Sequence, residues 1–193
     1  MIRTMQAKDS MEAAALLWEI FEDMELPLLK EIPQSKLLEM VAEAAEDPDY
    51  RYGVNRGLVY EYNGVIAGAI FGYPALDEPS IDESFKNVLQ KHGYESNLNL
   101  FIDQEALPNE WYLDSIVVNK KFRGMGIGTT LLEAMCQTAS DAGFERIGLN
   151  VDVANLKAKK LYSSIGFKKV ADITLSGHHY EHLCKPLETH VKA

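Results

Sequence analysis

The 193-residue sequence has little cysteine, no excess of positive charge and no long hydrophobic run. Its two cysteines, Cys136 and Cys184, have no metal-ligand spacing around them, so we expect reduced, packed thiols and no metal site. The net charge of -10 argues against a nucleic acid as a partner. The apolar N-terminal stretch AAALLWEIF is nine residues long and contains Glu19, which argues against a secretory or membrane-spanning segment. We therefore expect a cytoplasmic protein that does not insert into a membrane.

The composition is that of a folded domain, with 47% hydrophobic and 25% charged residues. A chain of this length predicts a single domain over residues 1–193. Its charge is uneven: residues 1–110 hold 21 acidic and 8 basic side chains, whereas residues 111–193 hold 8 and 11. One interpretation is that an anionic ligand meets the C-terminal part and a cationic one the N-terminal part. The other is that the acidic residues are solvated helix faces.

Strand-like and helical patterns alternate along the chain, which predicts an α/β protein. The predicted strands are 2–6, 57–62, 65–73, 111–118, 146–151, 167–175 and 178–183. The first predicted helix begins at Ser10, and the others span 34–45, 83–91, 126–142 and 155–165. The dipeptide Asn63-Gly64 predicts a tight antiparallel hairpin. The segment 74–109 is too long for a simple connection and is expected to cover a site.

A glycine-rich run, KFRGMGIGTTLLEA, lies between a predicted strand and a predicted helix. Gly124, Gly126 and Gly128 occupy alternate positions there, although glycine disfavours a helix. Backbone N–H groups at a helix N-terminus favour an anion, and Lys121 or Arg123 can add a charge-assisted contact. The run therefore predicts a phosphate-binding loop.

The spacing of the glycines excludes two familiar phosphate loops. A dinucleotide fingerprint requires a further glycine at a position that here holds Thr129 or Leu131, and a P-loop requires a Gly-Lys-Ser/Thr sequence that does not follow. Nicotinamide dinucleotide proteins and P-loop kinases are therefore weak alternatives.

What the run resembles is the cofactor-binding motif R/Q-x-x-G-x-G/A of the GNAT superfamily of N-acetyltransferases, with Arg123, Gly126 and Gly128 at the marked positions. The strand LDSIVV before it resembles the strand that leads into that loop in the family. Downstream, NLKAKKLYSSIGF matches the family segment N-x-x-A-x-x-L-Y-x-x-x-G-F at every marked position. The resemblance covers about residues 111–170.

The resemblance implies a mixed α/β fold with a mostly antiparallel sheet of about seven strands flanked by helices. Strands four and five would splay apart to hold acetyl-CoA, and residues 74–109 would be an inserted segment. The pyrophosphate would lie on the N–H groups of the glycine run, and the pantetheine arm would pair with the preceding strand. The residues implied in cofactor binding are Ile116, Val117, Val118, Arg123, Gly124, Met125, Gly126, Ile127, Gly128, Thr129, Asn155 and Tyr162.

The implied reaction is direct transfer of an acetyl group to a primary amine on a small molecule or a peptide. Tyr162 is the expected proton donor to the departing thiolate. In some relatives a glutamate lies five residues before the motif asparagine, but here that position holds Asn150. The predicted bases are Asp114, which has the same strand parity as Ile116 and Val118, and Asp152 at the end of the next strand. The alternative for each is a capping or solvent-exposed role.

The acceptor is expected to bind between the segments 22–33 and 74–109, whose acidic side chains suit a cationic amine. His178, His179 and His182 are expected to be mostly structural, with one of them as a candidate for the lining of the acceptor pocket. The family sometimes pairs subunits through C-terminal strands, so a homodimer is compatible with the resemblance. The alternative function is a catalytically silent acyl-CoA-binding or sensor protein with the same fold.

Overall fold

The computed structural model describes residues 1–95 and 97–188. Within them, seven strands form one sheet in the order β1-β2-β3-β4-β5-β7-β6. The strands are β1 (Ile2–Thr4), β2 (Gly57–Tyr62), β3 (Val65–Pro74), β4 (Trp111–Val118), β5 (Arg146–Asp152), β6 (Lys168–Leu175) and β7 (His178–Pro186). All pairs are antiparallel except β4 with β5. The predicted seven-stranded, mostly antiparallel sheet is confirmed.

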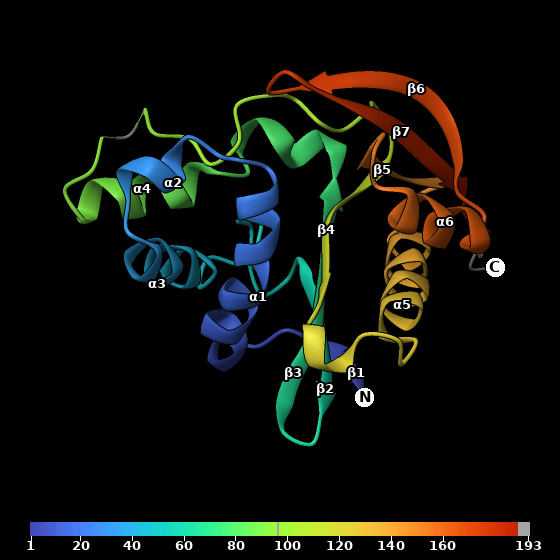
Figure 1. Cartoon of the computed structure of the whole chain (residues 1–193), viewed down its shortest axis with the longest axis horizontal. Coiled ribbons are helices and arrows are strands. Elements are labelled where there is room, and N and C mark those ends of the chain that lie inside the picture. Colours follow the sequence, from blue (N-terminus) through green and yellow to red (C-terminus); the bar gives the residue numbers. More distant parts are fainter. Residues whose placement is uncertain (96, 189–193) are drawn as a thin grey trace.

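Helices cover both faces of this sheet (Figure 1). The α-helices are α1 (Ser10–Asp23), α2 (Leu28–Glu31), α3 (Gln34–Ala44), α4 (Glu83–Lys91), α5 (Ile127–Asp141) and α6 (Leu156–Ile165). On one face α1, α3 and α4 bury a cluster that includes Phe21, Leu37 and Phe71. On the other, α5 and α6 bury a cluster that includes Leu131, Leu149 and Phe167. The short helix α2 lies between Pro27 and Pro33 and was not predicted from the sequence.

The hairpin between β2 and β3 has the turn that the sequence predicts. Asn63 and Gly64 both have positive φ, 51° and 77°, as a two-residue turn between twisted antiparallel strands requires. The prediction that these two strands are antiparallel is confirmed.

The parallel strands β4 and β5 separate soon after they begin. They pair only at Trp111 with Ile147 and at Tyr112 with Gly148. Beyond these residues the facing edges of the two strands are not bonded to each other. In Figure 1, β4 continues to the segment that leads into α5, whereas β5 stays beside β7. The expected splay of strands four and five is confirmed.

A β-bulge lies in β4 at Asp114. Phe71 of β3 pairs with Ser115 and Gly72 pairs with Leu113, so Asp114 is an extra residue without a partner across the strands. Because of the bulge, both Asp114 and Ser115 point to the face that holds Arg51 and Tyr52. Side chains of Ile116 and Val118 pack on the opposite face, with α5. The prediction that Asp114 shares a face with those two residues is therefore wrong.

The segment 74–109 contains the 3₁₀ helix η2 (Ala75–Ser80) and α4. Its end is fixed to its beginning because the Glu78 carboxylate accepts hydrogen bonds from the backbone N–H groups of Glu105 and Ala106. Among the helices of the described residues, none is both long and apolar enough to cross a membrane.

Candidate active site

The glycine run forms the turn that leads from β4 into α5. Gly124 and Gly126 have φ of 83° and 78°, a conformation that other residues rarely adopt. Gly126 is the N-cap of α5, and the first helical hydrogen bond runs from Thr130 N–H to the Gly126 carbonyl. The preceding N–H groups of the first turn therefore have no acceptor within the helix. They form a positive helix end of the kind that binds anions.

A cavity of about 530 Å³, which we call the large cavity, lies over this helix end. Its walls are the C-terminal half of β4, the glycine run, the first two turns of α6 and one side of α1. Of the twelve residues predicted to bind the cofactor, all but Met125 line it. The Met125 residue is 52% exposed.

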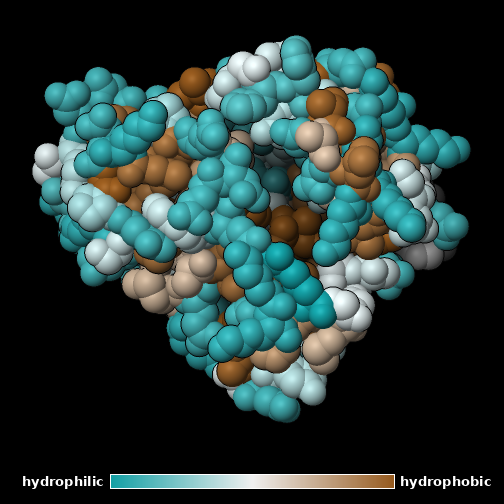
Figure 2. All heavy atoms as spheres, viewed as in Figure 1, coloured by the Kyte–Doolittle hydropathy of each residue, from teal (hydrophilic) through white to brown (hydrophobic). Residues whose placement is uncertain are grey.

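A second cavity, of about 210 Å³, lies between the diverging strands β4 and β5, and we call it the inner cavity. The two cavities adjoin, because they share the lining residues Ile20, Asp23, Ile116, Asn155, Ala158 and Tyr162. Figure 2 shows a hollow in the middle of this face, with hydrophobic residues at its base. Of the acceptor segments predicted from the sequence, 22–33 contributes Asp23 and Met24 to the inner cavity and 74–109 contributes Glu105.

Tyr162 lies where the two cavities meet. Its ring packs edge-on against Phe167 at 5.9 Å between centroids, and only 8% of the residue is exposed. Burial raises the pKa of its hydroxyl to about 12. The group is therefore protonated at neutral pH, as a proton donor must be. Asn155, about two turns before it, caps α6 by accepting a 3.1 Å hydrogen bond from Ala158 N–H.

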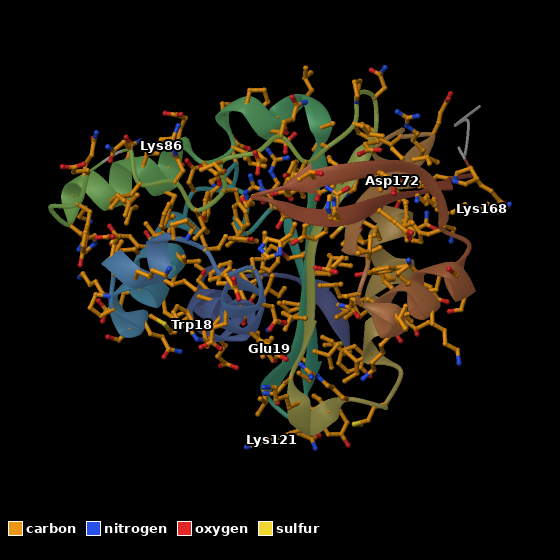
Figure 3. The ribbon with its side chains drawn as sticks, turned by 45° about the horizontal axis from the view of Figure 1, so that its top comes forward. Trp18, Glu19, Lys86, Lys121, Lys168 and Asp172 are labelled. Carbon is orange, nitrogen blue, oxygen red and sulfur yellow. The ribbon has the colours of Figure 1, made fainter. Side chains whose placement is uncertain are left out.

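Arg123 joins the glycine run to α1 across the mouth of the large cavity. Its Nη2 lies 2.8 Å from both carboxylate oxygens of Glu19, and its Nε donates to the carbonyl of Val118. Figure 3 shows Glu19 on α1 beside the end of β4 from which the segment with Lys121 continues. Glu19 thus balances the charge of Arg123 at the edge of this cavity, a pairing that the sequence did not indicate.

The two predicted bases differ in their surroundings, although both line the inner cavity. Asp114 is engaged on both oxygens: it accepts from Arg51 and from the Ser115 hydroxyl. Asp152 accepts a 2.7 Å hydrogen bond from Ala154 N–H and so caps the turn into α6.

Glu105 is a buried carboxylate of the inner cavity that sequence reasoning missed. One oxygen accepts a 2.8 Å hydrogen bond from the hydroxyl of Tyr112. Burial raises the pKa of this carboxyl to about 7, and the nearby Arg51 guanidinium opposes the shift. The sequence around Glu105 and Arg51 did not indicate that they belong to the site, because Arg51 lies in a loop and Glu105 in a stretch without periodicity.

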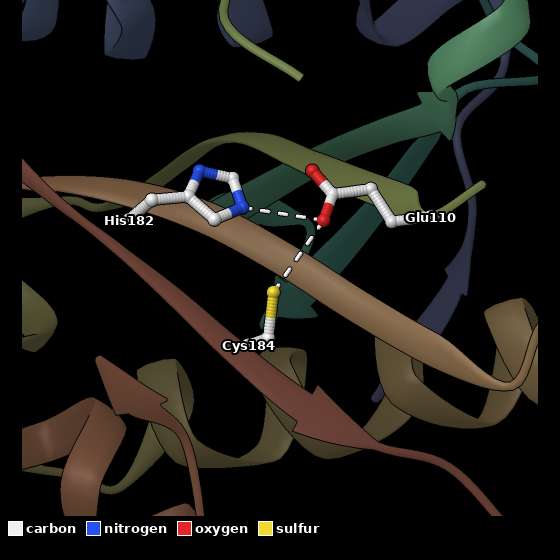
Figure 4. Close-up of side chains that lie close together, drawn as sticks. All are labelled: Glu110, His182 and Cys184. Atoms are coloured by element: carbon white, nitrogen blue, oxygen red, sulfur yellow. Dashed lines mark hydrogen bonds and ion pairs between the residues drawn. The ribbon is translucent and has the colours of Figure 1, made fainter. Parts of the chain in front are cut away.

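Glu110, His182 and Cys184 form a buried hydrogen-bond network (Figure 4). His182 contacts the Asn150 amide oxygen at 2.6 Å through Nδ1 and the Glu110 carboxylate at 3.2 Å through Nε2. The thiol of Cys184 donates to the same carboxylate, and burial raises its pKa to about 12. The ligand atoms of Glu110, His182 and Cys184 are close enough to hold a metal ion together. In this structure, His182 and Cys184 are both hydrogen-bonded to the Glu110 carboxylate.

Comparison with known proteins identifies the family. The model described as the acetyltransferase (GNAT) family matches residues 15–167. The chain belongs to this family. It is 48% identical to an acetyltransferase of known crystal structure, with a TM-score of 0.90 over 97% of this chain and 100% of that one. It is 29% identical to an N-acetyltransferase from Staphylococcus aureus Mu50, with a TM-score of 0.84 over 96% and 100% of the two chains.

Curated relatives match over shorter lengths. The chain is 32% identical over 115 residues to an N-alpha-acetyltransferase of Saccharolobus solfataricus, which is 59% of each protein. Across the curated relatives that it matches, the chain covers between 26% and 59% of their own length. The GNAT assignment agrees with the family that the glycine run and the Asn155 segment resemble.

Proposed function

We propose that this GNAT protein transfers an acetyl group from acetyl-CoA directly to a primary amine of a small molecule or a peptide. One observation carries the proposal: the opening between β4 and β5 and the bare N-terminus of α5 border adjoining cavities, with Tyr162 where they meet. A phosphate-bearing donor fits the large cavity, and an amine fits the inner one.

The residues of the large cavity suit the pyrophosphate of acetyl-CoA. The N–H groups of Ile127, Gly128 and Thr129 would hold it at the positive end of α5. A Cβ built on Gly124 or Gly126 meets nothing within 4 Å, so the backbone is open to a close approach. Arg123 would add a charged contact once it is released from Glu19.

The free edge of β4 suits the amide groups of the pantetheine arm. Asn119 N–H donates to the Ala67 carbonyl on the β3 side. Because donors alternate along a strand, the N–H of Val118 faces the opening instead. It would bond the pantetheine arm or polarise the thioester carbonyl.

The thioester supplies an acyl carbon that an uncharged amine can attack. Tyr162 would donate its hydroxyl proton to the departing sulfur. Asp23, Glu105, Asp114 and Asp152 line the inner cavity. Arg51 balances the charge of Asp114, and the remaining carboxylates favour a cationic amine over a neutral one.

The test is thiol release over a panel of amines with acetyl-CoA as donor. The proposal expects acceptor-dependent CoA release that falls at least about 100-fold in Tyr162→Phe. It expects faster turnover of diamines or basic peptides than of neutral amines. Binding of acetyl-CoA with no release for any amine would support the silent acyl-CoA-binding protein instead. Stabilisation by NAD and not by CoA would support a dinucleotide protein.

A further inference from the structure

We propose that Glu105 is the general base of this acetyl transfer and takes the proton from the ammonium group of the acceptor in the inner cavity. The inference rests on the proposed function. It assigns the role to a residue of the inserted segment 74–109 rather than to either aspartate of the splayed strands.

The backbone of Glu105 is held from two sides. Its N–H donates a 2.7 Å hydrogen bond to Glu78 of η2, and its carbonyl accepts a 3.0 Å hydrogen bond from the side chain of Asn150 on β5. The segment that carries Glu105 is thus bonded to the strand that borders the inner cavity. A base must keep its carboxylate within reach of one atom of the substrate, and these bonds fix its position.

The carboxylate itself is oriented by Tyr112 of β4. The Tyr112 hydroxyl donates to Oε2 of Glu105 at 2.8 Å and accepts from the Asn150 amide at 3.1 Å. Asn150 is in turn bonded to His182 of the buried network. Asn150 has no carboxylate of its own, but it places the carboxylate of Glu105 at the cavity that both residues line.

The competing carboxylates of the inner cavity have other structural roles. Asp114 is held by Arg51 in a buried ion pair, and proton uptake there would leave the guanidinium short of a partner. Asp152 caps the turn into α6, and Asp23 is exposed at the end of α1. Glu105 is farther from Arg51, with 3.9 Å between Nη1 and Oε1, so the ion pair constrains its protonation less.

The proton affinity of Glu105 suits a base at neutral pH. Burial raises the pKa of its carboxyl to about 7, where the group is ionised in part of the molecules and still binds a proton well. The titratable and charged groups around it are Arg51, Tyr73, Glu78, Tyr112, Asp114 and Tyr180. Of these, Arg51 lowers the pKa, as does the hydrogen bond from Tyr112, whereas Asp114 and Glu78 raise it.

The resulting step balances. Glu105 takes one proton from the ammonium group, and the freed nitrogen lone pair forms the N–C bond as the C–S bond breaks. Tyr162 gives its proton to sulfur and regains one from the nitrogen. Glu105 then releases its proton to water, so that the products are the amide, CoA and one proton.

The test compares Glu105→Gln with Glu145→Gln, which removes one charge from an exposed site outside both cavities. The rate kcat/KM is measured from pH 5.5 to 9.5 with the fastest amine of the panel. The kcat/KM of wild type and of Glu145→Gln should rise with pH, with an apparent pKa of about 7. Glu105→Gln should be slower by at least about 100-fold at pH 7 and lack that rise. Its deficit should shrink toward pH 9.5 as the free amine accumulates.

Two further measurements separate catalysis from folding. At pH 6, Glu105→Gln should be at least as stable as wild type in thermal unfolding, and it should bind acetyl-CoA with a Kd within about twofold of the wild-type value. If Glu105→Gln does not fold, Glu105→Asp is used instead, because it keeps a carboxylate. Its kcat/KM should still rise with pH, and its kcat should be lower than that of wild type. The assignment would be overturned if Glu105→Gln kept the wild-type kcat/KM and its rise with pH. It would also be overturned if that rise were lost in Asp152→Asn alone. Wild-type protein that releases CoA with no amine would instead contradict the proposed function itself.

Discussion

Arg51 and Asp114, which are 63 residues apart in the chain, form an ion pair with both side chains only 2% exposed. The same guanidinium donates to Asp82 at 2.9 Å and to the hydroxyl of Tyr73 at 3.0 Å. The bulge in β4 turns Asp114 toward this cation and so joins the sheet to the inserted segment next to the inner cavity.

Replacing Arg51 with leucine should destabilise the protein strongly. The change leaves the Asp114 carboxylate buried without its cationic partner, which typically costs about 3–5 kcal/mol in free energy of unfolding. Chemical denaturation at pH 7 measures it. The matched control is Arg56→Leu, whose partner Asp77 is 37% exposed, and which should cost about 1 kcal/mol or less. Equal losses in the two variants would mean that the Arg51–Asp114 pair does not stabilise the fold.

Replacing Glu19 with glutamine should strengthen the binding of acetyl-CoA. The Glu19 carboxylate accepts hydrogen bonds from Arg123 in an ion pair and places a negative charge beside the large cavity. Because the pair is partly exposed, its release is worth about 0.2–1 kcal/mol, or a Kd lower by roughly 1.5- to 5-fold. Calorimetric titration at low salt measures it, with Glu133→Gln on the exposed side of α5 as the control. The gain should fade in 0.5 M salt, and weaker binding would contradict the role given to Arg123.

Stability should depend on pH through Glu105. Its pKa rises from 4.5 to about 7 on folding, so the unfolded chain ionises first as the pH increases. The folded state thus keeps its full relative stability below about pH 4.5 and loses on the order of 1–3 kcal/mol of it by about pH 7. In Glu105→Gln this loss should be missing. The free energy of unfolding of the variant, measured with urea, should therefore increase relative to that of wild type from pH 5 to pH 8. A constant difference across that range would show that Glu105 does not titrate with a raised pKa.

Local chemistry explains why much of the fold could be predicted. The Asn63-Gly64 turn and the glycine run depend on a few adjacent residues, and the periodicity of each strand and helix is visible without its neighbours. The large cavity is built from such elements, which is why eleven of twelve predicted residues line it.

Long-range contacts explain what was missed. Asp114 was placed by strict alternation, which fails at a bulge that only the pairing with β3 reveals. Glu105 reaches the inner cavity through hydrogen bonds to Glu78 and Asn150, 27 and 45 residues away in the chain. No spacing within the sequence encodes contacts of this kind.

Gly128 offers a way to separate what the glycine run does for the fold from what it does for a ligand. It lies in the first turn of α5, and a Cβ built there meets only Leu161 and Val118, both at 3.8 Å. Alanine therefore fits the protein without strain and should raise the free energy of unfolding by up to about 1 kcal/mol, since it favours a helix over glycine.

The same Gly128→Ala variant should bind acetyl-CoA more weakly, by about 10-fold or more, measured by calorimetry. Its new methyl group would lie between two side chains that line the large cavity, in the space that the donor needs. Gly126→Ala is the contrasting variant: its φ of 78° strains alanine, so both stability and affinity should fall. Unchanged affinity in Gly128→Ala would mean that the donor does not approach this turn of α5, because the substitution leaves the protein's own contacts intact.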